Sequence, residues 1–437
     1  MALIPQRELF SWKEIENLGD LERLELVLEY LPDEQLMQRL EAMRGKGRDD
    51  WPVRAVWNSI LAAVVYQHPS IESLRRELSR NPQLRWLCGF DVTRTDKLVP
   101  PSSSYTRFLK RLMEQREEVE AVFDELIEQL RAELPDLGQM LALDGKALRS
   151  VARRPSKLST VDGRRDLDAN RGVKTYWVED GNNANPWKKV KSWFGYKLHL
   201  IVDANYELPV AFSITKASAN EMPEGKKLIR QLKDKHPGIV GRCEHLAADK
   251  GLDDTELNTM LWDEHGIKPL IDIRNCWKDA EQTRQVEGTR NVVYDYQGTV
   301  SCYDMRLGQR KQMAYAGFEA ERGTLKYRCP AKHYGCKCHW KDQCPIKGAV
   351  RIKLEQDRRV FTPLARSSYK WKDLYKKRTA VERVNSRLDV SFGFEHHFIR
   401  GQAKMKLRMN LAMIVMLTMA LGRIKQKQHE QMRRLVA

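Results

Sequence analysis

The stretch "LGQMLALDGKAL", residues 137–148, marks the point where the sequence changes from helix-forming to sheet-forming patterns. Its apolar run from Met140 to Leu143 is short and continuous, which is typical of a buried strand, and it ends on Asp144 and a glycine. Further runs predict strand, strand, helix, strand, helix and strand, in that order, through residue 273. Three consecutive strands followed by alternating helices and strands predict an α/β fold, a mixed sheet with helices packed on it.

The segments on either side of this sheet have different patterns. Residues 1–135 repeat apolar side chains every three or four positions, which predicts a helical domain. The Arg and Lys residues between these positions are either solvated helix faces or a surface that grips DNA. Short strand-like runs predict a β-rich insertion at 275–368, and helical patterns at 369–422 complete the core that begins at 136–274. A basic tail, 423–437, ends the sequence.

The composition is strongly basic, with 76 Lys and Arg against 59 Asp and Glu and a formal net charge of +17. Such a surface attracts polyanions, so nucleic acid is the expected class of partner. The basic residues 149–166 are predicted to form a flexible excursion. No run reaches the roughly 18 to 20 apolar residues of a membrane span, and the longest, 411–421, predicts a buried helix. The start lacks a signal-peptide core and the eight Cys are unevenly spread, which predicts a reducing, cytoplasmic location.

Three carboxylates occupy positions that suit metal ligands. Asp144 and Asp249 each follow a short apolar run and stand close before a glycine. A charge at the end of a buried strand is costly unless a cation meets it, so two of them in one sheet indicate a shared metal. The alternative is that both residues simply form turns.

The third carboxylate, Glu382, lies in "YKKRTAVERVNSRL", residues 375–388, which predicts a helix. One face of that helix would carry Tyr375, Arg378, Glu382, Asn385 and Asp389. Glu382 is therefore either a third metal ligand or an exposed partner of Arg378 one turn earlier.

The spacing Tyr, two residues, Arg, three residues, Glu in "YKKRTAVE" resembles the last catalytic motif of the DDE transposases of bacterial insertion sequences. Upstream, residues 59–90 and 100–112 resemble the helical N-terminal domain of these enzymes. Asp389 stands where the family commonly has Lys or Arg, and Leu252 where an aromatic is frequent. Other segments similar in order and type are "LDGKALR" (143–149), "GYKLHLIVDANYELPVAFSITKASANE" (195–221), "AADKGLDDTEL" (247–257) and "HHFIRGQAKMKLRMNLAMIVM" (396–416).

The resemblance implies a ribonuclease H-like core in which the first and fourth strands are neighbours. Asp144 and Asp249 would then meet, with Glu382 arriving from a later helix. Two Mg²⁺ or Mn²⁺ ions held by these residues would clamp the attacking and leaving oxygens of a phosphodiester. Water would free a DNA 3′-OH, and that hydroxyl would attack target DNA.

The resemblance also implies double-stranded DNA as the partner, both transposon ends and target. A homodimer would join two ends in the cytoplasm of a bacterium, at the nucleoid. Residues expected to hold DNA are Tyr375, Lys376, Lys377, Arg378, Arg383, Arg387 and Lys197, and those expected beside the metal ligands are His199 and Asn385. Two other functions stay open: a catalytically silent DNA-binding protein, which the three retained carboxylates argue against, and a metal-dependent nuclease without strand transfer.

Half of the cysteines fall in "CPAKHYGCKCHWKDQC", residues 329–344. The thiolates of Cys329, Cys336, Cys338 and Cys344 could form a closed tetrahedral Zn²⁺ site. Their spacing differs from paired Cys-x-x-Cys knuckles, so buried free thiols in a turn-rich insertion are the alternative. The basic residues of this segment would fit either a structural role or contact with transposon-end DNA.

Overall fold

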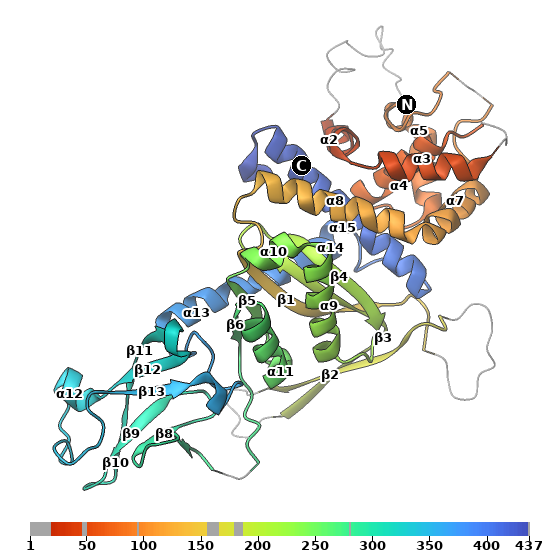
Figure 1. Ribbon diagram of the computed structural model, residues 1–437. Coiled ribbons are helices and arrows are strands. Elements are labelled where there is room, and N and C mark those ends of the chain that lie inside the picture. Colours follow the sequence, from red (N-terminus) through yellow and green to blue (C-terminus); the bar gives the residue numbers. More distant parts are fainter. Residues whose placement is uncertain are drawn as a thin grey trace, which may run out of the picture.

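The computed structural model describes residues 19–45, 50–93, 96–154, 166–178, 187–278 and 281–435. Figure 1 shows three groups of elements in a row: N-terminal helices, a central sheet flanked by helices, and a smaller β-rich lobe. The end of the chain returns from the β-rich lobe across the sheet to the N-terminal helices.

The N-terminal region is helical, as predicted. Its helices are α2 (Glu22–Tyr30), α3 (Glu34–Arg44), α4 (Val53–Val65), α5 (Ile71–Arg80), α6 (Pro82–Cys88), α7 (Ser102–Glu114) and α8 (Arg116–Glu133), after a 3-10 turn at Gly19–Leu21. Local chemistry sets several ends. Ser70 accepts from the amide of Ser73 to begin α5, and Asn81 caps α6, whose first residue is a proline. Gly89, in the left-handed region at φ 90°, ends α6.

The central sheet has the predicted ribonuclease H-like order. Its strands are β1 (Met140–Arg149), β3 (Trp187–Asp203), β4 (Leu208–Lys216), β5 (His245–Ala248) and β6 (Lys268–Ile271), with β2 (Asn170–Val178) at one edge. They run β4-β3-β1-β5-β6, where β1 is antiparallel to β3 and parallel to β5. The first and fourth strands predicted from the sequence are therefore neighbours. All four residues of β5 are buried, as expected for a parallel strand covered on both faces.

Helices cover both faces of this sheet. They are α9 (Glu221–Lys235), α10 (Pro237–Arg242), α11 (Thr255–Thr259) with a π-helical turn at Met260–Glu264, α13 (Tyr369–Tyr375), α14 (Thr379–Ser391) and α15 (Gln402–Lys425). In Figure 1, α9 and α11 lie in front of the sheet and α14 behind it. Both α9 and α14 contact β3, so the sheet is sandwiched between them.

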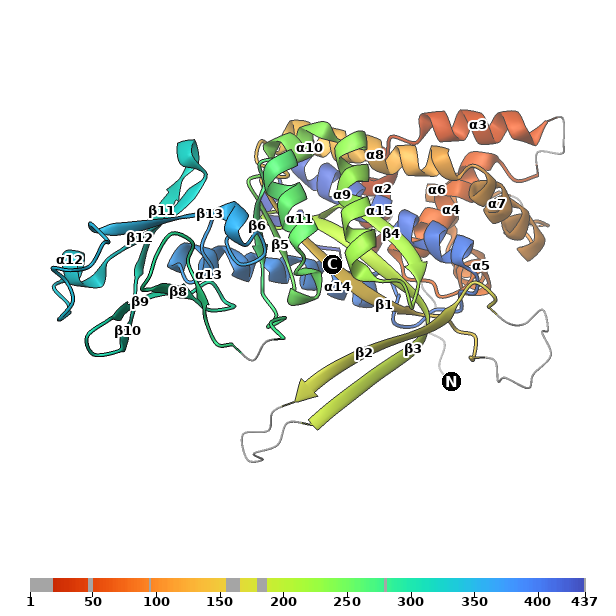
Figure 2. The same cartoon turned by 60° about the horizontal axis from the view of Figure 1, so that its bottom comes forward.

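A two-stranded ribbon was not predicted from the sequence. The first half of β3 pairs with β2 from Gly195 opposite Asn170 to Trp187 opposite Val178, and Figure 2 shows this ribbon projecting away from the body. Because residues 187–192 are exposed on both faces, they carry no alternating apolar pattern that would reveal a strand. Trp193 packs over Gly172, where a Cβ would come within 2.4 Å of the indole, so this crossing requires glycine. Most of the predicted excursion, 155–165, lies outside the described residues.

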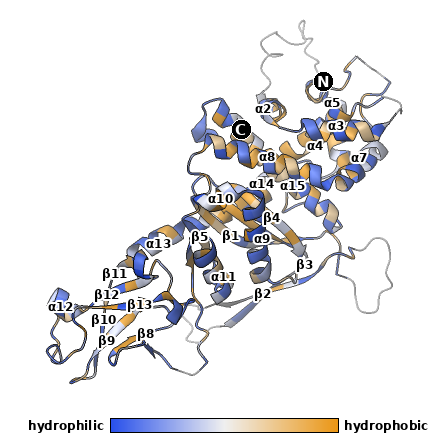
Figure 3. Cartoon of the chain, in the orientation of Figure 1, coloured by the Kyte–Doolittle hydropathy of each residue, from blue (hydrophilic) through white to orange (hydrophobic). Residues whose placement is uncertain are grey.

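Helix α15 runs through the middle of the molecule. With 24 residues, the helix is longer than the predicted apolar run 411–421. By length and composition alone it could span a membrane. Residues 409–422 are all buried inside the fold, which confirms the predicted core helix. Figure 3 shows hydrophobic residues concentrated where α15 meets the neighbouring helices and the sheet.

The N-terminal helices and the sheet share one hydrophobic core. A single cluster of buried side chains extends from Leu21 to Leu435, and α15 contacts α2, α4, α7, α8 and β4. A Cβ on Gly422 would lie 2.7 Å from Leu26, so α15 and α2 cross in close contact. The end of the basic tail is part of this core: Met432 and Leu435 are buried, and Arg23 donates to the Leu435 carbonyl at 2.8 Å.

The β-rich lobe has its own core. Its strands are β7 (Arg284–Gln285), β8 (Val292–Tyr294), β9 (Val300–Asp304), β10 (Gln309–Gln312), β11 (Ala314–Glu319), β12 (Thr324–Arg328) and β13 (Ala349–Lys353), with α12 (Pro330–Tyr334) after β12. They form two antiparallel sheets around a separate hydrophobic cluster. Arg366 joins this lobe to the sheet, since its buried guanidinium donates to the carbonyls of Ile271 and Val360 at 2.9 and 2.8 Å.

Candidate active site

The register between β1 and β5 places two aspartates side by side. Leu143 is opposite Ala248 in this parallel pair, and Asp144 and Asp249 are the next residue on each strand. Both side chains are half-buried. Each also shapes its own turn, because Asp144 accepts from the Gly145 amide and Asp249 from the Gly251 amide, both at 2.8 Å. Turn formation and a shared cation site are therefore compatible at these positions.

The surroundings of Asp144 disfavour its charge. Burial raises the pKa of Asp144 to about 6, and the neighbouring carboxylates of Asp249 and Glu221 add to the rise, whereas the Gly145 amide and Lys174 oppose it. Two neighbouring carboxylates, of which Asp144 has a raised pKa, form a suitable environment for a divalent cation.

Glu221 is a carboxylate that the sequence did not single out. It begins α9, and a Cβ on Gly145 would lie 2.9 Å from its carboxyl group, so glycine is needed beside Asp144 for this close approach. The Glu221 carboxylate pairs with Lys197 at 3.2 Å and with Lys174 at 3.8 Å. The signal available in the sequence was its position directly after β4 in "SANE", at the start of a helix.

Glu382 lies on α14, which packs on the face of the sheet opposite α9 (Figure 1). The predicted continuous helix is interrupted: α13 ends at Tyr375, a 3-10 turn covers Lys376–Arg378, and α14 then begins. The 3-10 turn touches β1 and β5, and α14 packs on β1. Glu382 is half-exposed and accepts from Arg378 at 2.6 Å, the pairing weighed as its alternative role. Among the described residues, no three His, Cys, Asp or Glu side chains are grouped closely enough to hold a metal ion as they stand.

The aromatic Tyr375 supports this turn. Its ring stacks on Trp371 with 4.6 Å between centroids, and the Arg378 guanidinium lies 5.9 Å from the Tyr375 ring. Tyr375 and Arg378 thus form one contact group with Glu382, although they do not share a single α-helix.

Several of the basic residues expected to hold DNA bind within the fold. Arg383 donates to Glu207 at 2.6 Å, and Arg387 forms an ion pair with the same carboxylate. Glu207 is buried, has φ 57° in the turn between β3 and β4, and also pairs with Arg433 of the tail at 3.4 Å. The ion pairs of Glu207 hold α14 against the sheet. They could not be predicted, because Glu207 is remote in sequence from its arginine partners.

The three lysines that were expected to hold DNA also contact other residues of the protein. Lys377 donates to the Asn205 side chain at 2.8 Å, while exposed Lys376 lies 3.4 Å from Asp373. Lys197 is buried and donates to the Ala219 carbonyl at 2.8 Å.

Residues expected beside the metal ligands lie in the sheet and on α14. His199 is buried, hydrogen-bonds Thr215 at 2.9 Å, and has its pKa lowered to about 4 by burial and by Lys197. Asn385 is half-buried, and within the described part of the chain its Oδ1 has no hydrogen-bond partner. Asp389 pairs at 2.5 Å with Lys146, two residues beyond Asp144 on β1.

A divalent cation fits the donor set at this edge of the sheet. Asp144 and Asp249 provide hard oxygen ligands whose mutual repulsion a cation would remove. The four cysteines proposed for zinc are in the β-rich lobe, where Cys329, Cys338 and Cys344 line one small cavity while Cys336 is exposed.

Two family models match the chain. A model described as "Transposase DDE domain" matches residues 159–418, a range that includes Asp249 and Glu382 and begins after Asp144. A model described as "Transposase domain (DUF772)" matches residues 10–111. No curated protein matches the chain.

Among solved structures, the chain is similar to a piggyBac transposase in a synaptic complex with hairpin DNA, at 13% identity and a TM-score of 0.38. That alignment covers 95% of this chain and 79% of the other. Similarity of this size supports no conclusion about the site. The DDE match, however, spans more than half of the chain, and its combination with the N-terminal transposase domain is typical of bacterial insertion-sequence enzymes. The chain belongs to the DDE transposase family.

Proposed function

We propose that this transposase cuts DNA strands at the ends of its own element and joins the freed 3′ ends to target DNA. The observation that carries the proposal is the juxtaposition of Asp144 and Asp249 on neighbouring parallel strands, where burial and like charge raise the pKa of Asp144. Carboxylates so arranged bind cations that activate phosphodiester chemistry.

Asp144, Asp249 and Glu382 would hold two Mg²⁺ or Mn²⁺ ions. These ions would supply activation of the attacking oxygen and neutralisation of the leaving oxygen. The carboxylates contribute position: Asp144 and Asp249 are held by their own turn hydrogen bonds, and Glu382 by the packing of α14 on β1. Water attacks a phosphodiester at the transposon end, which leaves a 3′-OH on one side of the cut and a 5′-phosphate on the other. That 3′-OH then attacks a phosphodiester of target DNA at the same site, and the leaving group is the 3′-OH of the cut target strand.

Arg378, which is expected to bind a DNA phosphate, is also proposed to keep Glu382 away from the cations until DNA binds. The pair is solvent-accessible on a helix surface, with 21% of the Arg378 and 50% of the Glu382 side chain exposed. Exposed pairs of this kind contribute only about 0.3 to 0.5 kcal/mol. A DNA phosphate, which binds guanidinium in a bidentate manner, can therefore displace the carboxylate. Glu382 would then turn toward Asp144.

Double-stranded DNA is the proposed partner, consistent with the net charge of +17. Two transposon ends would be held by a homodimer. We place the protein in the bacterial cytoplasm at the nucleoid, where such DNA is found.

The test uses DNA that carries an end of the element, with Mg²⁺, and separates cutting from joining on a gel. Asp144→Asn, Asp249→Asn and Glu382→Gln should each abolish cutting and leave DNA affinity nearly unchanged. The matched control is Glu395→Gln, an exposed carboxylate shortly after α14. Cutting by any of the three variants within about tenfold of the parent would refute the assignment of that residue.

The same experiment distinguishes the two other functions. A parent protein that binds the DNA without cutting it would be a silent DNA-binding protein. Cutting without any joined product would indicate a nuclease. The retained carboxylate pair on β1 and β5 favours the transposase over the silent protein.

A further inference from the structure

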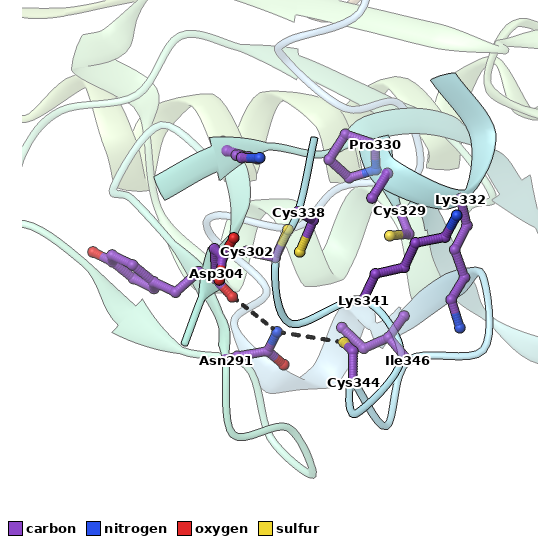
Figure 4. Close-up of a pocket in the computed structure, with 13 residues that line it drawn as sticks. Asn291, Cys302, Asp304, Cys329, Pro330, Lys332, Cys338, Lys341, Cys344 and Ile346 are labelled. Carbon is purple, nitrogen blue, oxygen red and sulfur yellow. Dashed lines mark hydrogen bonds between the residues drawn. The ribbon is translucent and has the colours of Figure 1, made fainter. Parts of the chain in front are cut away.

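A small cavity in the β-rich lobe brings together cysteines from three separate segments. Cys302 lies on β9, Cys329 directly follows β12, and Cys338 and Cys344 belong to the loop before β13. All four line the same cavity of about 20 Å³, and Figure 4 shows their sulfur atoms around it. That volume suits one water-sized particle or one metal ion, and excludes an organic ligand.

The set differs from the four cysteines that are close in sequence. Cys336 is exposed and is not among the residues lining the cavity, whereas Cys302, 27 positions before Cys329, is. Burial raises the pKa of the Cys302 thiol to about 11, and the neighbouring thiols of Cys329, Cys338 and Cys344 add to the rise. In the structure, Cys302 therefore replaces Cys336 in the set of candidate zinc ligands.

The surroundings of the cavity suit a cluster of thiolates. The side-chain amide of Asn291, which is buried, donates to the Cys344 sulfur at 3.7 Å and to the Tyr303 carbonyl at 3.2 Å. Figure 4 marks both contacts with dashed lines. Lys332 and Lys341 also line the cavity. An amide that donates to a ligand sulfur is typical outer-sphere support for a metal.

Nearby oxygen and nitrogen ligands are already engaged. The carboxylate of Asp304, at the end of β9, accepts from the His339 backbone amide at 2.7 Å and lies 3.3 Å from the His339 ring. The cavity therefore offers sulfur donors above all, and an all-thiolate set selects Zn²⁺ over Mg²⁺ or Ca²⁺.

We propose that Cys302, Cys329, Cys338 and Cys344 bind one structural Zn²⁺ ion in tetrahedral geometry. Each thiol releases its proton to solvent when the zinc–sulfur bond forms. The described side chains are not yet grouped at ligand spacing, so binding requires rotation of the cysteine side chains toward the cavity. The ion would tie the sheet that contains β9 to the end of β12 and to the loop carrying Cys338 and Cys344.

The first experiment measures zinc in the purified full chain by elemental analysis after gel filtration. The background is Asp144→Asn, which removes a candidate ligand of the active-site cations. We expect one zinc per chain, lost in Cys302→Ser and retained in the matched control Cys336→Ser. Loss of zinc from the Cys336 variant with retention in the Cys302 variant would overturn the proposed ligand set.

The second experiment needs no substitution and therefore stands even if Cys302→Ser fails to fold. Thiols of the full chain are alkylated with iodoacetamide before and after zinc is removed with a chelator, and each site is read by mass spectrometry. Cys302, Cys329, Cys338 and Cys344 should become reactive only after chelation, whereas exposed Cys276 and Cys336 should react in both states. A chelator-independent pattern, or disulfides among the four, would overturn the proposal. Because these readouts do not use DNA cutting, they are independent of the proposed transposase activity.

Discussion

At the residue scale, the candidate site depends on how Asp144 and Asp249 share one edge of the sheet. Their positions were predictable, because a continuous apolar run fixes where a buried strand ends and parallel neighbours end at the same edge. The ion pairs of Glu207 and Glu221 were not predictable, because their cationic partners are distant in sequence. Cys302 escaped prediction because the three cysteines that share its cavity lie 27 or more positions later in the sequence.

The raised pKa of Asp144 predicts a stability change that depends on pH. The folded state binds this proton more tightly than the unfolded chain, so the contribution to stability is lost as pH rises from about 4 to about 6. Above pH 6 the ionised carboxylate costs at most ~3 kcal/mol. In metal-free buffer at pH 7.5, Asp144→Asn should therefore raise the urea midpoint of unfolding, and the gain should shrink toward pH 4. Added Mg²⁺ should stabilise the parent but not this variant.

The control for that measurement is Asp373→Asn, an exposed carboxylate on α13. It should leave the midpoint nearly unchanged at both pH values. An Asp144→Asn protein that is less stable than the parent at pH 7.5 would contradict the destabilising role of the buried charge.

The contact between Arg378 and Glu382 predicts a measurable effect on cation binding. Arg378→Gln removes a restraint worth a few tenths of a kcal/mol, so Mn²⁺ should bind the DNA-free chain about twofold more tightly. The same variant should bind DNA more weakly, because it has lost a guanidinium. Calorimetric titration with Mn²⁺ measures the first effect, and Arg378→Lys, which keeps the charge, serves as the control. Unchanged or weaker Mn²⁺ binding by Arg378→Gln would show that Glu382 is not restrained in this way.

At the element scale, the ribbon of β2 and β3 is the most prominent feature outside the compact body (Figure 2). Lys188, Lys189 and Lys191 are exposed along it, next to exposed Trp187 and Val190. A two-stranded ribbon has the width that the DNA major groove accepts. The apolar patterns of buried strands made the central sheet predictable, whereas the ribbon, which has no core to face, was not.

If the ribbon contacts DNA, removing its exposed lysines should reduce the salt dependence of DNA binding. Lys188→Ala combined with Lys189→Ala should lower the slope of log affinity against log salt concentration by up to about 1.8, since each phosphate contact contributes about 0.9. Fluorescence anisotropy at several salt concentrations measures the slope. The control is Lys227→Ala with Lys233→Ala, two exposed lysines of α9. Equal losses in both variants would mean that net charge, rather than the ribbon, is responsible.

At the scale of the whole molecule, His236, the residue between α9 and α10, contacts two carboxylates of α8. The buried His236 ring lies 2.7 Å from Glu128 and 3.2 Å from Asp124, which also binds Lys235 at 2.8 Å. Burial alone would lower the pKa of His236, but the two carboxylates outweigh it and the pKa is raised. The helical region is therefore attached to the catalytic core by charge as well as by packing.

This attachment predicts a second dependence on pH. A raised His236 pKa stabilises the fold fully below about pH 6.5, and the contribution is lost as pH rises through the folded-state pKa. The difference in unfolding free energy between the parent and His236→Gln, on the order of 1 kcal/mol at pH 6, should therefore diminish at pH 9. Thermal unfolding at both pH values measures it, with exposed His429→Gln as the control. A difference that grows with pH would contradict the protonated pairing.

The organisation of the whole chain was only partly predictable, because sequence patterns report local structure and not packing between distant segments. Periodicity identified the helices of the N-terminal region and the separate strands of the insertion, because each pattern is local. It did not reveal that α15 completes the core of the N-terminal helices, because that packing joins residues such as Leu26 and Gly422 across nearly the full length of the chain.

The path of α15 has a consequence for synthesis of the protein. Helices α2, α4, α7 and α8 bury apolar faces against α15, which the ribosome makes long after them. During translation these helices lack their partner, and that surface stays open to chaperones until residues 402–425 have been made. A fragment ending before residue 402 should accordingly fail to yield a stable N-terminal module, so DNA-binding studies on this protein call for the intact polypeptide.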